Sequence, residues 1–296
     1  MNFLLYAICT LIWGSTWLVI TFQVDSASPI ASVFWRFSLG ALILFSYCGV
    51  TKKKLSYGKQ DHLTFMAMGI FMFSINYMLV YWSETMISSG IAAICFTVIV
   101  PYNMIGMRIF FKKPITAKVV MGSLLGGAGI ALIFMNEILG LQANKNTIFG
   151  LVLGLIATLS ASTGNMLSQR SYRKSVPVVI SNTWGMLYGS IFTLLVGLLL
   201  QHSFAIPMTG KYLSSLLYLA LFGSVFAFGA YLSLAGRIGA ERAAYSGVIS
   251  PIIALTLSSM YEDFKWTPYI VAGVALCLLG NILTLYSPKK LTKSAG

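Results

Sequence analysis

The chain has 296 residues, of which 57% are hydrophobic and only 9% are charged, and its net charge at pH 7 is +13. Soluble domains typically carry about 25% charged residues, so this composition excludes an ordinary soluble fold and indicates a protein embedded in a lipid bilayer. The positive charge does not indicate nucleic-acid binding, because the Lys and Arg residues lie in short segments between apolar runs, where they act as an orientation signal.

Apolar stretches of about 20 residues, each long enough to cross a bilayer as a helix, follow one another along the chain. Their approximate limits are 3–22, 31–50, 62–83, 87–111, 116–136, 148–169, 178–200, 212–235, 241–261 and 266–286. The first stretch lacks the positively charged start and the small-residue cleavage site of a signal peptide, so we interpret it as a retained membrane helix. The sequence therefore predicts an all-α membrane protein with ten transmembrane helices.

The distribution of Lys and Arg predicts how these helices are oriented. If the N-terminus is placed inside and the loops are assigned alternately, 16 Lys and Arg residues fall inside and 3 fall outside. Arg36, within the second apolar stretch, completes the total of 20. The positive-inside rule gives this distribution for a protein with both termini in the cytoplasm. We expect a multi-pass protein of the cell inner membrane, with residues 288–296 as a cytoplasmic tail.

The two halves of the chain share landmarks at a nearly constant spacing. Tyr81 and Tyr231 lie 150 residues apart, and so do Pro101 and Pro251, each of which falls in the middle of a predicted helix. One match of this kind is weak, but several in the same order indicate a duplication.

An odd number of helices in each copy gives the two copies opposite orientations in the membrane. The sequence therefore predicts two inverted five-helix repeats, at residues 1–138 and 147–287. Inverted repeats are typical of secondary transporters, whose substrate site lies near the bilayer midplane between the repeats.

Four segments carry a resemblance to a known family: IWGSTW at 12–17, PIASVFWRF at 29–37, GIAAICFTVIVPYNMI at 90–105 and GAERAAYSGVISPIIAL at 239–255. Through them the sequence resembles the EamA-type family of the drug/metabolite transporter superfamily over nearly its whole length. The resemblance implies ten helices, cytoplasmic termini, and export or uptake of metabolites such as amino acids. It also implies a central cavity lined by the first, third and fourth helices of each half, with the fifth and tenth helices at the periphery.

The sequence departs from the family at one place. The family ends its fourth helix with a Gly-Glu segment, whereas this chain has FFKKPIT at 110–116. The second half keeps the acid, as YEDF at 261–264. The role of this position in the first half is therefore open.

Polar residues on one face of the predicted sixth helix are candidates for substrate binding. Thr158, Ser162 and Asn165 follow one another at helical spacing, and the matching face of the first helix carries Thr10 and Trp17. Such a face should point away from lipid. It can bind a polar solute, or it can form hydrogen bonds between helices.

The two mid-helix prolines are a second group of candidates. A proline removes a backbone donor, which frees the carbonyl four residues earlier, here that of Thr97 for Pro101 and that of Gly247 for Pro251. Paired interruptions in corresponding helices of two repeats point to a transporter's binding region. A simple helix kink is the alternative interpretation.

Aromatic residues form the third group of candidates for substrate binding, namely Trp13, Trp17, Tyr77, Tyr81 and Tyr231. The two tryptophans, together with Trp35 and Trp82, can stack on an aromatic or cationic solute. Tyr77 and Tyr81 share a face of the third helix with Glu84, whereas the matching face of the eighth helix offers only Tyr231, and an asymmetric solute would require such an asymmetry. Anchoring at the membrane interface is the alternative, and for membrane tryptophans it is the more common use.

Arg36 and Glu84 are predicted to form a gate or an ion pair. A charge inside a membrane helix is costly, so Arg36 should have a partner, and Glu84 or Asp25 are the candidates. The functional interpretation is capture of a substrate carboxylate or control of the outer mouth. A structural ion pair is the alternative, and Glu84 can also extend to the interface as long polar side chains do.

No sequence pattern predicts catalysis, a metal or a cofactor. His62 and His202 lie in predicted loops, and the four cysteines lie in apolar runs without a CxxC pair. The segment MTGKY at 208–212 lacks the flanking residues of a P-loop. We therefore predict that the chain is not an enzyme and needs no cofactor or metal, with an intramembrane enzyme or a channel as the alternatives.

Together these patterns predict a secondary transporter that moves a small polar or amphipathic metabolite by alternating access. The resemblance implies an amino acid or a related compound, and an amine or a nucleoside-like metabolite is the alternative. The expected partners are the solute and the lipid bilayer, without nucleic acid. The sequence leaves the coupling ion, the direction of transport and the oligomeric state open, and a monomer is compatible with it.

Overall fold

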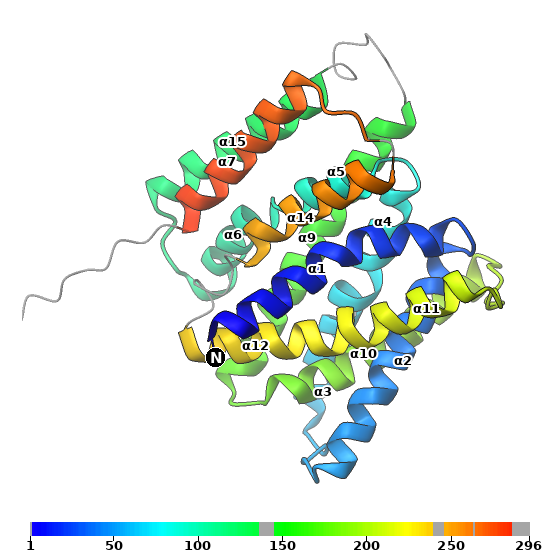
Figure 1. Cartoon of the computed structure of the whole chain (residues 1–296). Coiled ribbons are helices and arrows are strands. Elements are labelled where there is room, and N and C mark those ends of the chain that lie inside the picture. The colour runs from blue at the N-terminus through cyan, green and yellow to red at the C-terminus, as the bar shows by residue number, and fades with distance from the viewer. Residues whose placement is uncertain (1, 136–144, 239–245, 263, 286–296) are drawn as a thin grey trace, which may run out of the picture.

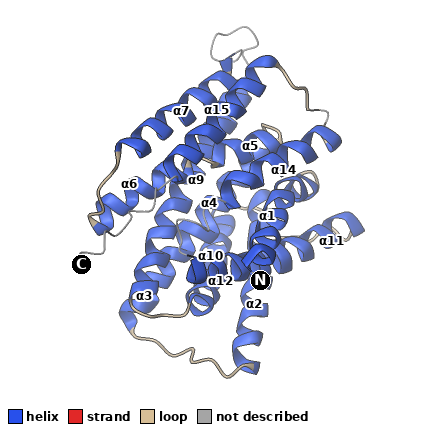
Figure 2. Cartoon of the chain, turned by 60° about the vertical axis from the view of Figure 1, so that its left-hand side comes forward, coloured by secondary structure: helices blue, strands red, loops and turns tan. Residues whose placement is uncertain are grey.

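The computed structural model describes residues 2–135, 145–238, 246–262 and 264–285. The described residues form helices joined by short turns and loops, and they contain no strand (Figure 2). The predicted tail at 288–296 lies outside the described residues, as does the start of the ninth predicted helix. The all-α prediction is confirmed for the part of the chain that the structure describes.

Fifteen helical elements follow in chain order within the described ranges (Figure 1). They are α1 (Asn2–Val24), α2 (Pro29–Val50), α3 (Lys59–Met68), η1 (Gly69–Ile75), α4 (Asn76–Glu84), α5 (Ser89–Phe96), α6 (Ile99–Phe111), α7 (Ala117–Ile133), α9 (Lys145–Arg173), α10 (Val178–Leu199), α11 (Gly210–Tyr218), η2 (Leu219–Phe226), α12 (Ala227–Ile238), α14 (Ser246–Tyr261) and α15 (Pro268–Leu285).

Seven helices in the described ranges are long and apolar enough to cross a membrane. Three further apolar helices are shorter, at Ala117–Ile133, Ile249–Tyr261 and Pro268–Thr284. Large apolar side chains such as Leu124 and Leu198 are exposed on the outside of the bundle, with 69% and 58% of their surface accessible. Lipid, rather than water, is the solvent that suits such a surface, so the chain is a multi-pass membrane protein.

Two long helices contain a π-helical segment at matching positions. The segments η1 and η2 begin at Gly69 and Leu219, which lie 150 residues apart, the spacing already seen between Tyr81 and Tyr231. At the first of them the backbones are in direct contact, because a Cβ atom added at Gly69 would lie 2.3 Å from the carbonyl oxygen of Gly185. π-Helical turns are rare and often mark functional regions.

The two mid-helix prolines behave differently. A turn at Thr97 and Val98 separates α5 from α6, next to the carbonyl that Pro101 leaves without its helical donor. Pro251 lies inside α14, which continues past it without a break. The predicted pairing of interruptions is therefore not seen in the described residues. Pro251 has no N–H for the carbonyl of Gly247, and this one missing hydrogen bond leaves the described residues Ser246–Tyr261 helical.

The loops gather at two ends of the bundle. We call one end the basic rim, formed by residues 51–58, 112–116 and 174–177. There the indole Nε1 of Trp184 donates to the carbonyl of Leu55 at 3.2 Å, and Lys174 pairs with Asp61 at 2.9 Å.

The opposite end is the acidic rim, formed by residues 25–28, 85–88, 200–209 and 262–267 without residue 263. There the indole Nε1 of Trp35 donates to the carbonyl of Phe204 at 3.0 Å, and Ser28 and His202 share a hydrogen bond of 3.2 Å. Alternate loops therefore lie together in space, as the alternating assignment of the sequence requires.

Helices α7 and α15 pack closely against each other at the edge of the bundle in both views (Figures 1 and 2). Small residues allow this contact, because Cβ atoms added at Gly129 and Gly280 would lie 2.5 Å and 2.4 Å from the carbonyl oxygens of Gly273 and Gly122. Helix α1 instead contacts helices from both halves of the chain, among them α4, α5, α12 and α14.

Candidate functional site

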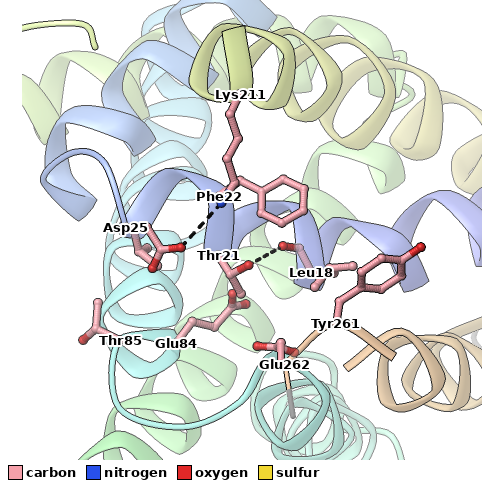
Figure 3. Close-up of a pocket in the computed structure, with 10 residues that line it drawn as sticks. Leu18, Thr21, Phe22, Asp25, Glu84, Thr85, Lys211, Tyr261 and Glu262 are labelled. Atoms are coloured by element: carbon pink, nitrogen blue, oxygen red, sulfur yellow. Dashed lines mark hydrogen bonds and ion pairs between the residues drawn. The ribbon is translucent and has the colours of Figure 1, made fainter. Parts of the chain in front are cut away.

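A cavity of about 370 Å³ opens at the acidic rim between helices from both halves of the chain (Figure 3). Its walls come from α1, from the end of α4, from the start of α11 and from the end of α14. The lining residues are Leu18, Thr21, Phe22, Val24, Asp25, Glu84, Thr85, Lys211, Tyr261 and Glu262. Its size lies within the range of small-molecule sites, about 300–1,000 Å³.

Lys211 is the only basic residue that the structure describes in the lining, and it already has partners. Its Nζ lies 3.8 Å from a carboxylate oxygen of Asp25 and 4.6 Å from the centre of the Phe22 ring. Both charged side chains are more than half exposed, so the pair adds little to stability. The pair does affect the charge of the cavity, because Asp25, one of the carboxylates of the described lining, neutralises the positive charge of Lys211.

Glu262 joins the two halves at the mouth of the cavity. Its carboxylate accepts a hydrogen bond from the backbone N–H of Ser89 at 3.2 Å and a short hydrogen bond from the Ser89 hydroxyl. Ser89 is the first residue of α5, where unpaired N–H groups and the helix dipole favour a negative charge. Glu262 therefore connects the end of α14 to the start of α5.

Glu84, the last residue of α4, is buried without a partner. Only 7% of its surface is accessible, and neither carboxyl oxygen has a hydrogen-bond partner among the described residues. The side chain points toward Glu262 across the cavity (Figure 3). An ionised carboxyl group in such a place is costly, so the site suits either a neutral carboxylic acid or a carboxylate that meets a cation.

Arg36 lies in a polar network behind the cavity and is 1% exposed. Its Nε donates to the hydroxyl of Ser224 at 3.1 Å and its Nη1 donates to the hydroxyl of Tyr81 at 3.3 Å. The Tyr81 hydroxyl in turn donates to Oε1 of Gln23 at 2.8 Å. The guanidinium also lies 4.6 Å from the centre of the Tyr77 ring. The network joins α1, α2, α4 and η2.

The predicted ion pair of Arg36 is not formed as a direct salt bridge among the described residues, and its role in a gate stays a prediction. In the described part of the chain Arg36 forms no salt bridge, whereas Asp25 pairs with Lys211 and Glu84 stays unpaired. Hydroxyl groups and aromatic faces surround the guanidinium instead, and together they offset part of the cost of burying its charge.

The predicted aromatic residues near α1 pack against each other rather than line the cavity. Trp13 contacts Phe228 and Tyr231, with ring centres 5.3 Å and 5.1 Å apart, and Trp17 contacts Phe96 at 5.4 Å. Thr10 is buried nearer the N-terminus of α1. At a helical rise of 1.5 Å per residue it lies about 12 Å along the helix axis from Leu18, which lines the cavity. These residues form a layer between the cavity and the basic rim.

The predicted face of the sixth helix, now part of α9, is satisfied by protein groups. The Thr158 hydroxyl donates to the carbonyl of Gly154 at 2.7 Å, and the Asn165 amide donates to Oδ1 of Asn103 at 3.2 Å. Ser162 is buried. The bond of Asn165 to Asn103 is a hydrogen bond between helices, as in the alternative interpretation, whereas the bond of Thr158 lies within α9.

The remaining candidates also lie outside the cavity lining. The Thr97 hydroxyl donates to the carbonyl of Ile94 at 2.6 Å, Pro101 is half-buried and Pro251 is buried. Of the predicted site residues, Glu84 alone lines the cavity. Lys211 and Glu262 are not among the predicted site residues, although acidic residues gather in the predicted outside loops and are a signal for this end of the bundle.

An all-helical, multi-pass protein with a polar cavity between its two halves has the architecture of a membrane transporter. The family model described as the EamA-like transporter family matches residues 2–135 and again 148–286. The chain therefore belongs to the EamA-like transporter family, within the drug/metabolite transporter superfamily.

Proteins named as transporters are similar over nearly the whole chain. The uncharacterized transporter YoaV of Bacillus subtilis is 24% identical over 280 residues, which cover 94% of each protein. The uncharacterized inner membrane transporter YedA of Escherichia coli K12 is 28% identical over 291 residues, 92% of this chain and 89% of YedA. A solved structure called "Crystal structure of protein" shares the fold, with a TM-score of 0.68, 14% identity and 96% coverage of both chains.

Proposed function

We propose that the protein is a secondary transporter that carries a small polar or amphipathic metabolite across the inner membrane by alternating access. The observation that carries the proposal is the cavity at the acidic rim, because both halves of the chain contribute to its walls. A site between two repeats can open to one side of the membrane and then to the other when the repeats move relative to each other.

The proposal includes ten membrane crossings in two inverted repeats, at residues 1–138 and 147–287. Seven helices that can span a bilayer and three shorter apolar helices support this number. The matching positions of η1 and η2 and the double match of the family model support the duplication. The excess of Lys on the basic rim favours a cytoplasmic position for that rim and for both termini.

In this mechanism the acidic rim faces the outside and the cavity receives solute there. The layer of Trp13, Trp17 and Tyr231 separates the cavity from the basic rim. Movement of this layer and of the Glu262 contact to Ser89 would close the outer mouth and open an inner one. By family resemblance the solute is an amino acid or a related compound, and an amine or a nucleoside-like metabolite is the alternative.

Flux through purified protein in proteoliposomes tests this proposal. Amino acids, amines and nucleosides are first screened by thermal shift, since a ligand that binds the native state raises the unfolding temperature. We expect at least one class to raise it, and labelled members of that class to enter proteoliposomes with saturable kinetics and competition by the unlabelled compound. Flux that rises linearly with solute concentration, without saturation, would indicate a channel. Chemical conversion of the solute without uptake would indicate an enzyme. Either result would contradict the proposal.

A further inference from the structure

We propose that the cavity at the acidic rim binds an organic ammonium ion, and that Glu84 gives up a proton when this ion enters. The inference rests on the proposed transport function and names its substrate class and its coupling ion. Its basis is a carboxyl group that is more than nine-tenths buried, lines the cavity and has no partner.

The charges of the cavity favour a cation over an anion. Among the described residues three carboxyl groups line it, and the single basic residue, Lys211, is paired with Asp25. Glu262 has the N–H and the hydroxyl of Ser89 as donors. Glu84 is left as the one lining carboxyl group with neither a hydrogen-bond donor nor a salt-bridge partner among the described residues. A solute carboxylate here would meet like charges, whereas an ammonium group would supply Glu84 with donors.

The remaining walls fit the carbon skeleton of an amine. Leu18 and Val24 are apolar, and Phe22 and Tyr261 are aromatic. Aromatic faces attract cations and also pack against apolar groups. An ammonium group close to Glu84 with an aromatic or alkyl tail against these side chains matches the lining better than an anion or a zwitterion does.

The burial of Glu84 links this binding to a proton. In the empty cavity the neutral carboxylic acid is the favoured form, because an ionised group would be buried without a partner. When the ammonium ion binds, the O–H bond of Glu84 breaks, the proton leaves to water at the cavity mouth, and the carboxylate pairs with the ammonium group. Proton and amine therefore exclude each other at Glu84, and transport exchanges one for the other.

Other charged and titratable groups face Glu84 from each element packed around it. Glu262 and Tyr261 lie on α14, Asp25 on α1 and Lys211 on α11. Arg36 on α2 and Tyr81 on α4 lie behind it. The nearest parts of α5 and α9 present Ser88, Ser89 and Gly150, which carry no charge. The experiment must therefore separate Glu84 from Glu262.

Calorimetric binding to the purified protein in nanodiscs tests the inference. The ammonium probes are tyramine and hexylamine, and the matched analogues are 4-ethylphenol, which lacks the charge, and 3-(4-hydroxyphenyl)propionate, which reverses it. We expect an ammonium probe to bind at least about 10-fold more tightly than both analogues. We also expect binding to strengthen as pH rises, and a pH indicator in weak buffer to record proton release on amine binding.

Two variants locate the effect. Glu84→Gln is expected to weaken amine binding about 10-fold or more and to abolish both the pH dependence and the proton release. Asp61→Asn removes an equal charge at the basic rim and should leave both unchanged. Loss of proton release in Glu262→Gln but not in Glu84→Gln would overturn the role of Glu84. If Glu84→Gln does not fold, Glu262→Gln decides the question: proton release that persists in this variant supports Glu84 as the source, and its loss overturns the role of Glu84.

The inference and the proposed function fail in different ways. If 3-(4-hydroxyphenyl)propionate or 4-ethylphenol binds and neither amine does, the ammonium inference is overturned while carrier activity can stand. If amines bind and release no proton, the exchange is overturned. A third outcome separates binding from transport: tyramine binds with proton release, but no labelled amine enters proteoliposomes whose interior is acidic. In that case the ammonium site stands and the transport function is contradicted.

Discussion

Replacing Arg36 by Glu is expected to destabilise the protein by about 3–5 kcal/mol, the cost of leaving an uncompensated charge in a buried site. The new carboxylate would lie where the guanidinium is 1% exposed. It would lose the hydrogen bond to Tyr81 and the favourable contact with the Tyr77 ring, and it would add a like charge behind Glu84. Unfolding in mixed micelles, followed by tryptophan fluorescence, measures the change.

Arg36→Met is the matched control for this prediction. Methionine keeps an unbranched apolar chain and removes the charge, and the two hydroxyl groups keep other partners. Tyr81 still has Gln23 as acceptor, and Ser224 still donates to the carbonyl of Leu219 at 3.0 Å. We expect a change of about 1 kcal/mol or less, because an apolar replacement of a buried charge is often neutral. A Glu variant as stable as the Met variant would contradict the structural role given to Arg36.

Gly280→Ala is expected to destabilise the protein by about 1–3 kcal/mol, the usual cost of overpacking. The added Cβ would lie 2.4 Å from the carbonyl oxygen of Gly122 and 2.8 Å from the backbone nitrogen of Gly126. Backbone atoms cannot rotate away as a side chain can, so α7 and α15 would have to separate. Unfolding in mixed micelles and the fraction of monodisperse protein after heating measure this effect.

Gly127→Ala is the control on the same pair of helices. Its Cβ would meet no atom within 4 Å, and Gly127 lies on the exposed side of α7. Alanine also favours the helical state over glycine. We therefore expect unchanged or slightly higher stability. Equal losses at Gly127 and Gly280 would show that α7 and α15 do not pack in the way described.

The helices were predictable from the sequence to within a few residues. The stretch expected at 178–200 is α10, Val178–Leu199, because the basic segment before it and the polar segment after it mark its limits. The π-helical segments were not predictable. At η1 the segment packs on the backbone of Gly185 and Gly189, far away in sequence, and hydrophobic periodicity holds no information about that contact.

The candidate site was predictable only in part, for a physical reason. Helix periodicity shows which residues share a face, as Thr158 and Asn165 do, of which Thr158 is buried and Asn165 bonds to α6. It does not show whether a neighbour already satisfies a polar group, as Asn103 does for Asn165. The cavity forms where the ends of four separate segments meet, so residues such as Lys211 and Glu262 become part of it only through the tertiary fold.

Cysteine accessibility tests the central claim most directly, namely that the cavity lies on the opposite side of the membrane from the basic rim and opens outward. Thr85→Cys places a thiol in the exposed part of the cavity lining, and Lys53→Cys places one on the basic rim. The native cysteines at 9, 48, 95 and 277 are all buried and give little background. With a membrane-impermeant maleimide added outside spheroplasts, we predict labelling of Thr85→Cys, and labelling of Lys53→Cys only after lysis. Labelling of both from the outside, or of Lys53→Cys alone, would contradict the account.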